Sequence, residues 1–167
     1  MMSKHFEESG YLFDFSNSTS ALVADVPQLN GLSAIDFIVE AKDEILFIEV
    51  KNPDNSKATT KAKLDFLKDL SDDMYPHKIN LKYRDTILRE WACGKIPSKP
   101  IICIFILEFT SFTAFERERL KNKIFDRLPF SLNKFAPKGR KHLHGFELLT
   151  IDEFRNKYST FLITKVP

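Results

Sequence analysis

Two carboxylates and a lysine whose types and spacing could support metal-assisted hydrolysis lie close together in the chain. Asp36 lies in the apolar segment 34–40, and Glu49 and Lys51 lie at the end of the apolar segment 44–51. Carboxylate oxygens suit a hard divalent cation such as Mg²⁺. A bound cation can activate water and stabilise charge on a phosphate, and a nearby lysine can orient that water or neutralise the developing charge. These residue types therefore favour hydrolysis of phosphodiester bonds.

The segments 34–40 and 44–51 are predicted to be the two strands of a β-hairpin. Both are rich in β-branched and aromatic residues, and a polar pair separates them. If residues 42–43 form a two-residue turn, antiparallel pairing places Asp36 directly opposite Glu49 on one face of the hairpin. The lysine two residues beyond Glu49 shares that face, because side chains alternate along a strand. The hairpin would thus bring the three candidate residues together.

The expected juxtaposition of Asp36 and Glu49 requires a compensating cation. Like charges opposed on adjacent strands are destabilising. Glu49 also follows the apolar run 45–48, where burial of an unpaired charge is costly. Lys51 can compensate part of this charge, but a divalent cation bound through oxygen ligands would do so better. Mg²⁺ is therefore the expected cofactor, with Mn²⁺ as an alternative.

At these residues the chain resembles the PD-(D/E)xK nuclease superfamily. The family signature is an acidic residue on one strand and (D/E)-x-K on the next, here Asp36 followed by Glu49, Val50 and Lys51. The resemblance implies a restriction-endonuclease-like fold and a metal-dependent endo- or exonuclease activity. It assigns the metal to the side chains of Asp36 and Glu49 and to the backbone carbonyl of Val50, and it makes Lys51 the catalytic lysine.

The chain departs from the family pattern at two positions within a match that is close only over residues 31–53. Ile35 stands where the family frequently has proline. The helical acidic residue often found upstream has no single match, since Glu8 and Asp25 are both candidates. The segment 40–42 also fits E-x-K, but it lies at the expected turn and lacks an apolar strand.

Two alternatives stay open from the sequence. A three-residue turn at 42–44 would move Asp36 opposite Val50 and turn the carboxylates to different faces. The same pattern would also occur in an ordinary hairpin in which Glu49 and Lys51 are solvated edge residues. The first would remove the expected metal site unless a bulge restored the shared face, and the second would remove it outright.

The rest of the sequence predicts one α/β domain over residues 1–167. Its 43% hydrophobic content suffices for a single core. Leu64, Leu67 and Leu70 recur at helical spacing within 57–94, which predicts two helices joined near residues 75–76. The later elements are a C-terminal cap at Gly94, a buried strand over 101–108, capping boxes at 113–116 and 150–153 that each begin a helix, and a strand over 145–150. This order favours a mixed β-sheet flanked by helices.

The charge distribution suits a nucleic-acid partner, with DNA favoured over RNA. Residues 1–56 contain 3 Lys/Arg and 10 Asp/Glu, so the basic residues are concentrated in the remainder of the chain. The segment 134–144 has no acidic residue, and a solubilising surface loop is the alternative there to a phosphate-binding one. Its candidate nucleic-acid-binding residues are Lys138, Arg140 and Lys141.

Location and assembly are constrained less tightly. We expect a cytoplasmic protein without membrane association, because no apolar run approaches the length of a membrane span and the N-terminal residues lack the apolar core of a signal peptide. Cys93 and Cys103 are expected to be reduced core thiols. A homodimer and a component of a larger complex are both open. The alternative function is a catalytically inactive nuclease-fold module that binds nucleic acid or a protein partner.

Overall fold

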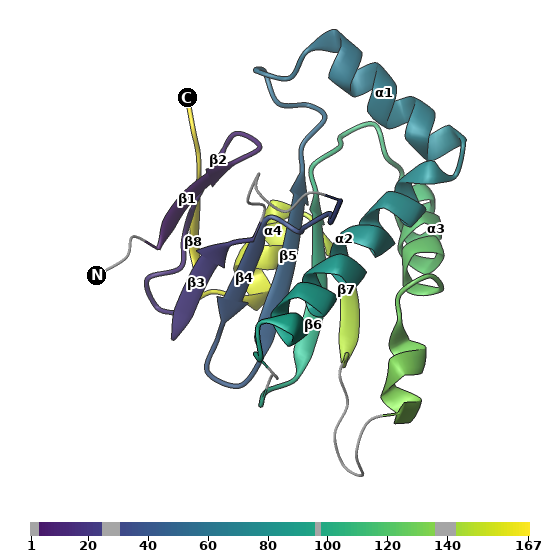
Figure 1. Cartoon of the computed structure of the whole chain (residues 1–167). Coiled ribbons are helices and arrows are strands. Elements are labelled where there is room, and N and C mark those ends of the chain that lie inside the picture. The colour runs from purple at the N-terminus through teal and green to yellow at the C-terminus, as the bar shows by residue number, and fades with distance from the viewer. Residues whose placement is uncertain (1–3, 25–30, 96–97, 136–142) are drawn as a thin grey trace.

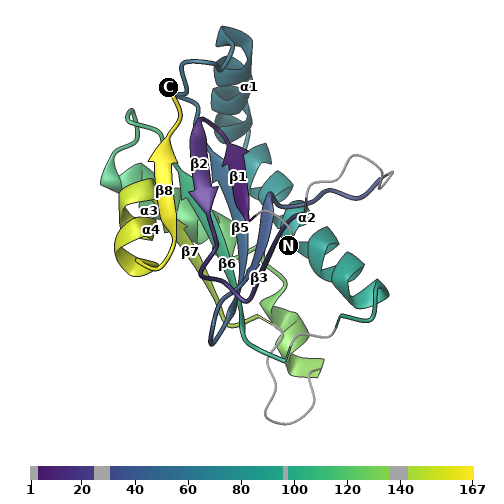
Figure 2. The same ribbon diagram turned by 90° about the vertical axis from the view of Figure 1, so that its left-hand side faces the viewer.

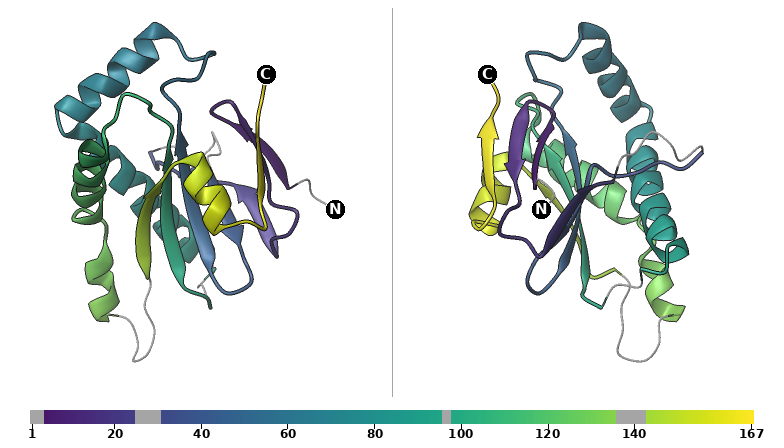
Figure 3. Two further views of the ribbon diagram at one scale, coloured as in Figure 1. Left: turned by 180° about the vertical axis from the view of Figure 1, so that it is seen from behind. Right: turned by 60° about the vertical axis from the view of Figure 1, so that its left-hand side comes forward.

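Alternating strands and amphipathic helices give the chain a layered α/β fold. The computed structural model describes residues 4–24, 31–95, 98–135 and 143–167. A mixed sheet forms the middle layer of this described part, with helices α1, α2 and α3 on one face (Figure 1). A small second sheet and helix α4 cover the other face (Figure 3). The expectation of an α/β fold with a mixed, helix-flanked sheet is confirmed.

The middle sheet has the strand order β3-β4-β5-β6-β7. Its strands are β3 (Ser20–Val23), β4 (Phe37–Glu40), β5 (Ile45–Lys51), β6 (Ile101–Leu107) and β7 (Gly145–Leu149). β3, β4 and β5 pair antiparallel, whereas β5, β6 and β7 run parallel. The predicted buried strand is β6. It is apolar along its whole length, as expected for a strand that is covered on both faces.

The hairpin of β4 and β5 has the register that a two-residue turn requires. The Ala41 N–H donates a hydrogen bond to the Glu44 carbonyl at 2.9 Å, and Phe37 pairs with Ile48. The ladder ends at Phe37 and Ile48, and the Asp36 N–H donates to the Ile48 carbonyl at 3.1 Å. The predicted direct pairing of Asp36 with Glu49 is therefore not part of the ladder. The prediction of a two-residue turn is confirmed, and the three-residue alternative is excluded.

Three helices and the middle sheet enclose the larger hydrophobic core. They are α1 (Thr60–Ser71), α2 (Met74–Ala92) and α3 (Ala114–Phe125). Two predicted helices are confirmed, although they separate at residues 72–73. In α1, Leu64 and Leu67 are exposed, and Phe66 is the buried residue. Gly94 caps α2 with a φ of 74°, a left-handed conformation that glycine adopts without strain.

The small sheet and α4 cover the second core. The helix was predicted from its capping box, but the three strands of the small sheet were not predicted. The strand order is β1-β2-β8, with β1 (His5–Glu8), β2 (Tyr11–Asp14) and β8 (Leu162–Lys165), and α4 spans Ile151–Lys157. Figure 2 shows these three strands in front of the middle sheet, with α4 beside β8. Phe13, Phe37 and Phe154 pack in the shared core between the two sheets.

Some of the remaining predictions are confirmed, one is wrong, and some fall on residues outside the described part of the chain. Both capping boxes are present, and a short 3-10 helix (Phe130–Phe135) follows α3. Cys103 is buried as expected, but Cys93 is exposed at the end of α2, so its prediction as a core thiol is wrong. Lys138, Arg140, Lys141 and Asp25 lie outside the described residues. None of the described helices is both long and apolar enough to cross a membrane.

Candidate active site

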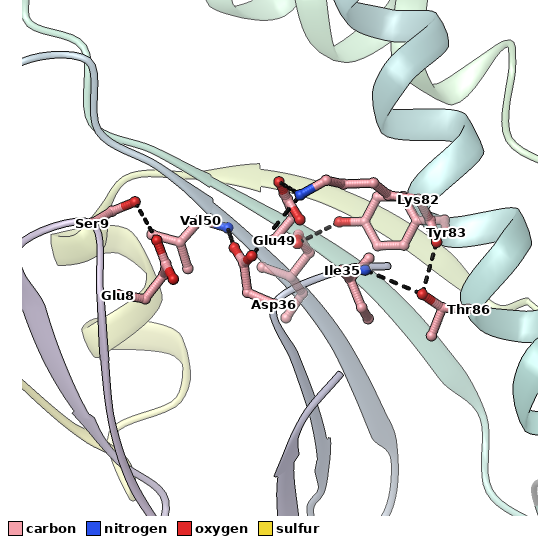
Figure 4. Close-up of polar contacts among 10 residues, drawn as sticks. Glu8, Ser9, Ile35, Asp36, Glu49, Val50, Lys82, Tyr83 and Thr86 are labelled. Carbon is pink, nitrogen blue, oxygen red and sulfur yellow. Dashed lines mark hydrogen bonds and ion pairs between the residues drawn. The ribbon is translucent and has the colours of Figure 1, made fainter. Parts of the chain in front are cut away.

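Asp36, directly before β4, and Glu49, in β5, lie side by side (Figure 4). Both carboxylates face the helical layer, and only 8% of Asp36 and 4% of Glu49 is exposed. Lys51 also faces this layer, with its Nζ 6.0 Å from the ring centroid of Phe66 in α1. Val50, between the two, packs instead in the core beneath the small sheet. The three predicted catalytic residues therefore share one face.

Asp36 is held in place by the backbone of β5. The Val50 N–H donates a hydrogen bond of 2.7 Å to Asp36 Oδ2. The N–H and C=O of one strand residue point to the same edge, so the Val50 carbonyl also faces Asp36. The next carbonyl, that of Lys51, points to the opposite edge and accepts from the Glu108 N–H. The Val50 carbonyl and Asp36 therefore lie at the same edge of β5, and Glu49 projects from the adjacent residue of that strand.

A second lysine, which was not among the residues predicted from the sequence, completes this cluster. Lys82 Nζ, from α2, lies 2.6 Å from Glu49 Oε1 and 4.0 Å from Asp36 Oδ1. The helical periodicity contained a signal for it, because Lys82 falls on the same face of α2 as buried Ile79, Tyr83 and Thr86. A lysine on the buried face of a helix requires a partner, and two carboxylates supply it.

The electrostatics of Glu49 favour a cation. Burial, together with the negative charges of Asp36 and Glu8, raises the pKa of Glu49 to about 8, whereas Lys82 opposes the shift. Glu49 Oε2 is buried and accepts no hydrogen bond from the described residues. An unsatisfied buried acceptor is costly. A cation at Oε2 would remove that cost and would favour the ionised carboxylate.

Helix α2 also fixes the chain segment that leads into Asp36. Thr86 Oγ1 accepts a hydrogen bond from the Ile35 N–H at 3.2 Å and donates one to the Lys82 carbonyl at 2.7 Å. Asp85 Oδ2 accepts from the Ser33 N–H at 3.1 Å. α2 therefore positions Asp36 through the backbone and Glu49 through the lysine.

Glu8, one of the two candidate upstream acids, approaches the same end of β5 from the β1–β2 hairpin (Figure 4). Its Oε1 accepts a hydrogen bond from the Ser9 hydroxyl at 2.8 Å. The Asn52 side chain donates to the Ser9 carbonyl at 3.1 Å and so ties this turn to the end of β5. Glu8 comes from a strand and not from the helix that the family pattern would supply.

No family model, curated protein or solved structure matches this chain.

The oxygen donors fit a hard divalent cation. Both carboxylates lie near the Lys82 ammonium, and Glu49 Oε2 lacks a hydrogen-bond partner among the described residues. Within those residues no group of three or more His, Cys, Asp or Glu side chains could hold a metal. A cation bound here would therefore depend on the Val50 carbonyl, on water and on substrate oxygens to complete its coordination, as Mg²⁺ sites commonly do.

Proposed function

We propose that this chain is a metal-dependent nuclease of the PD-(D/E)xK type that hydrolyses phosphodiester bonds, with DNA favoured over RNA. The observation that carries the proposal is the convergence of the buried Asp36 and Glu49 carboxylates on one face, with Lys51 on that face and Glu49 Oε2 lacking a hydrogen-bond partner among the described residues. Two buried carboxylates side by side destabilise a fold. Their presence therefore favours a functional role for this pair.

Each residue has a distinct role in the proposed reaction. The side chains of Asp36 and Glu49 and the carbonyl of Val50 would hold Mg²⁺, which supplies an activated water and stabilises phosphate charge. The Val50 N–H keeps Asp36 in a fixed orientation, so this carboxylate need not reorganise during the reaction. Lys51 orients the attacking water or neutralises charge on the scissile phosphate. Lys51 is the last residue of β5, and its amine lies 6.0 Å from the Phe66 ring centroid, in the helical layer that Asp36 and Glu49 also face.

The test is cleavage of labelled single-stranded DNA, double-stranded DNA and RNA by the purified full chain with Mg²⁺ or Mn²⁺. We expect cleavage that EDTA abolishes and that Glu49→Gln or Lys51→Ala lowers by about 10²-fold or more. The chain offers a matched control, because Glu40 and Lys42 form a second E-x-K at the hairpin turn. Glu40→Gln and Lys42→Ala should leave cleavage unchanged. Activity that persists in EDTA, or in both site variants, would exclude the assignment.

A second candidate function is a catalytically inactive module that binds nucleic acid or a protein partner. The ion pair between Lys82 and Glu49 favours it, because a cation of the protein itself already compensates a carboxylate. Such a module would bind nucleic acid without turnover in any divalent cation, and Glu49→Gln would not change its affinity. Cation binding that depends on Glu49 would favour the nuclease.

A further inference from the structure

Lys82 occupies the position that a bound cation would have to share. Its Nζ lies between the two candidate ligands, 2.6 Å from Glu49 Oε1 and 4.0 Å from Asp36 Oδ1. An ammonium group and a divalent cation this close to the same oxygens would repel each other strongly. A divalent cation that bridges Asp36 and Glu49 would therefore compete with the Lys82 ammonium for the negative charge of these carboxylates.

The surroundings of Lys82 allow its ammonium to leave. Its side chain is 29% exposed, whereas that of Glu49 is 5% exposed, so Lys82 reaches the carboxylate from the solvent side. The backbone of Lys82 is fixed, because its carbonyl accepts the hydrogen bond from the Thr86 hydroxyl. A lysine side chain has four flexible methylene groups, so rotation about these bonds can move the ammonium while α2 stays in place.

We infer that Lys82 is a built-in counter-ion that stabilises the metal-free site and that a divalent cation must displace. This inference rests on the proposed function, since it takes Asp36 and Glu49 as cation ligands. In the metal-free protein Lys82 compensates the buried carboxylates. When a cation takes over that role, the ammonium turns to the solvent side of the site, where a nucleic-acid phosphate would approach. Lys82 thereby sets the concentration of cation at which the site fills.

The first experiment measures Mn²⁺ and Mg²⁺ binding by isothermal titration calorimetry, without nucleic acid. Lys82→Gln removes the competing charge and should raise cation affinity by about tenfold or more, because the binding-competent state no longer has to be reached by breaking an ion pair. Lys82→Arg keeps a positive charge and should show no such gain. Lys78→Gln is the matched control one turn earlier on the same helix, because Lys78 pairs with Asp69 and not with a carboxylate of the site.

The second experiment uses the wild-type protein and does not depend on the folding of a variant. Reductive methylation of lysines, followed by mass spectrometry, reports how accessible each amine is. Addition of Mg²⁺ should increase the modification rate of Lys82, because its ammonium leaves the buried carboxylate, and should leave that of Lys78 unchanged.

The outcomes separate the inference from the proposed function. If the cation binds wild type and Lys82→Gln with equal affinity, and Lys82 modification does not respond to Mg²⁺, the counter-ion role is excluded while the metal site stands. If Lys82→Gln binds the cation and wild type does not, the inference is supported in its strongest form. If neither protein binds a cation, the inference and the proposed function both fail.

Discussion

At the scale of single residues, the site depends on where two buried carboxylates obtain compensation. Asp36 has the Val50 N–H at one oxygen and the Lys82 ammonium 4.0 Å from the other. Glu49 has Lys82 at one oxygen and no hydrogen-bond partner among the described residues at the other. This unequal compensation makes Glu49 the more sensitive reporter of a bound cation, and Asp36 the more important residue for local backbone order.

The role of Asp36 in backbone order can be measured by substitution. Asp36→Ala leaves the buried Val50 N–H without an acceptor, whereas Asp36→Asn can keep that hydrogen bond through its amide oxygen. Both variants remove the same negative charge beside Glu49, so their difference isolates the hydrogen bond. We expect Asp36→Ala to be less stable than Asp36→Asn by about 1–3 kcal/mol in urea denaturation. Equal stabilities would show that this bond does not hold Asp36.

At the scale of elements, α2 connects the parts of the site. It supplies Lys82, and its Thr86 accepts the hydrogen bond of the Ile35 N–H directly before Asp36.

The loops at the carboxyl ends of β5 and β6 are joined by Asp54. Its Oδ1 lies 2.6 Å from Lys63 Nζ, and its Oδ2 accepts from both the N–H and the hydroxyl of Thr110 at 2.8 Å.

Thr86→Val tests whether α2 positions Asp36. Valine keeps the shape of threonine but cannot accept the Ile35 N–H, so we expect a loss of about 1–2 kcal/mol in unfolding free energy. Cleavage should fall as well, because Asp36 follows directly on Ile35. Thr86→Ser retains the hydroxyl and is the matched control for the hydrogen bond. Cleavage by Thr86→Val at the wild-type rate would remove the positioning role.

The ion pair and hydrogen bonds of Asp54 should make the stability of the fold depend on pH. The hydrogen bond from Lys63, followed by those from Thr110, holds the pKa of Asp54 below its usual value of 3.8. A lowered pKa contributes stability that is present above the unfolded-state pKa and lost as pH falls through the folded-state pKa. Wild type should therefore exceed Asp54→Asn in melting temperature near pH 6, and this difference should shrink below about pH 4. A difference independent of pH would contradict the ionic role.

At the scale of the whole molecule, local pattern and long-range packing contributed differently to what the sequence could predict. The hairpin register was predictable because its turn and both strands are contiguous. Lys82 was not predicted, since its contact with Glu49 depends on how α2 packs on the sheet. The small sheet was missed because its strands have four residues each and β2 (11–14) pairs with β8 (162–165) from the far end of the chain.

The predicted basic segment provides a test of nucleic-acid binding at this scale. Replacing Lys138, Arg140 and Lys141 together with alanine should weaken DNA binding, measured by fluorescence anisotropy in Ca²⁺. It should also reduce the slope of affinity against salt by about one per lost phosphate contact. Cation affinity should stay at the wild-type value, which separates this segment from the metal site. An unchanged salt slope would assign the segment to solubility alone.

Anomalous scattering of Mn²⁺ in crystals of the full chain would locate a cation at the site directly. We predict a peak about 2.0–2.2 Å from carboxylate oxygens of Asp36 and Glu49 and from the Val50 carbonyl, with the Lys82 ammonium moved away from Glu49. A map at saturating Mn²⁺ with no peak between these residues, and with Lys82 still bonded to Glu49, would contradict this prediction.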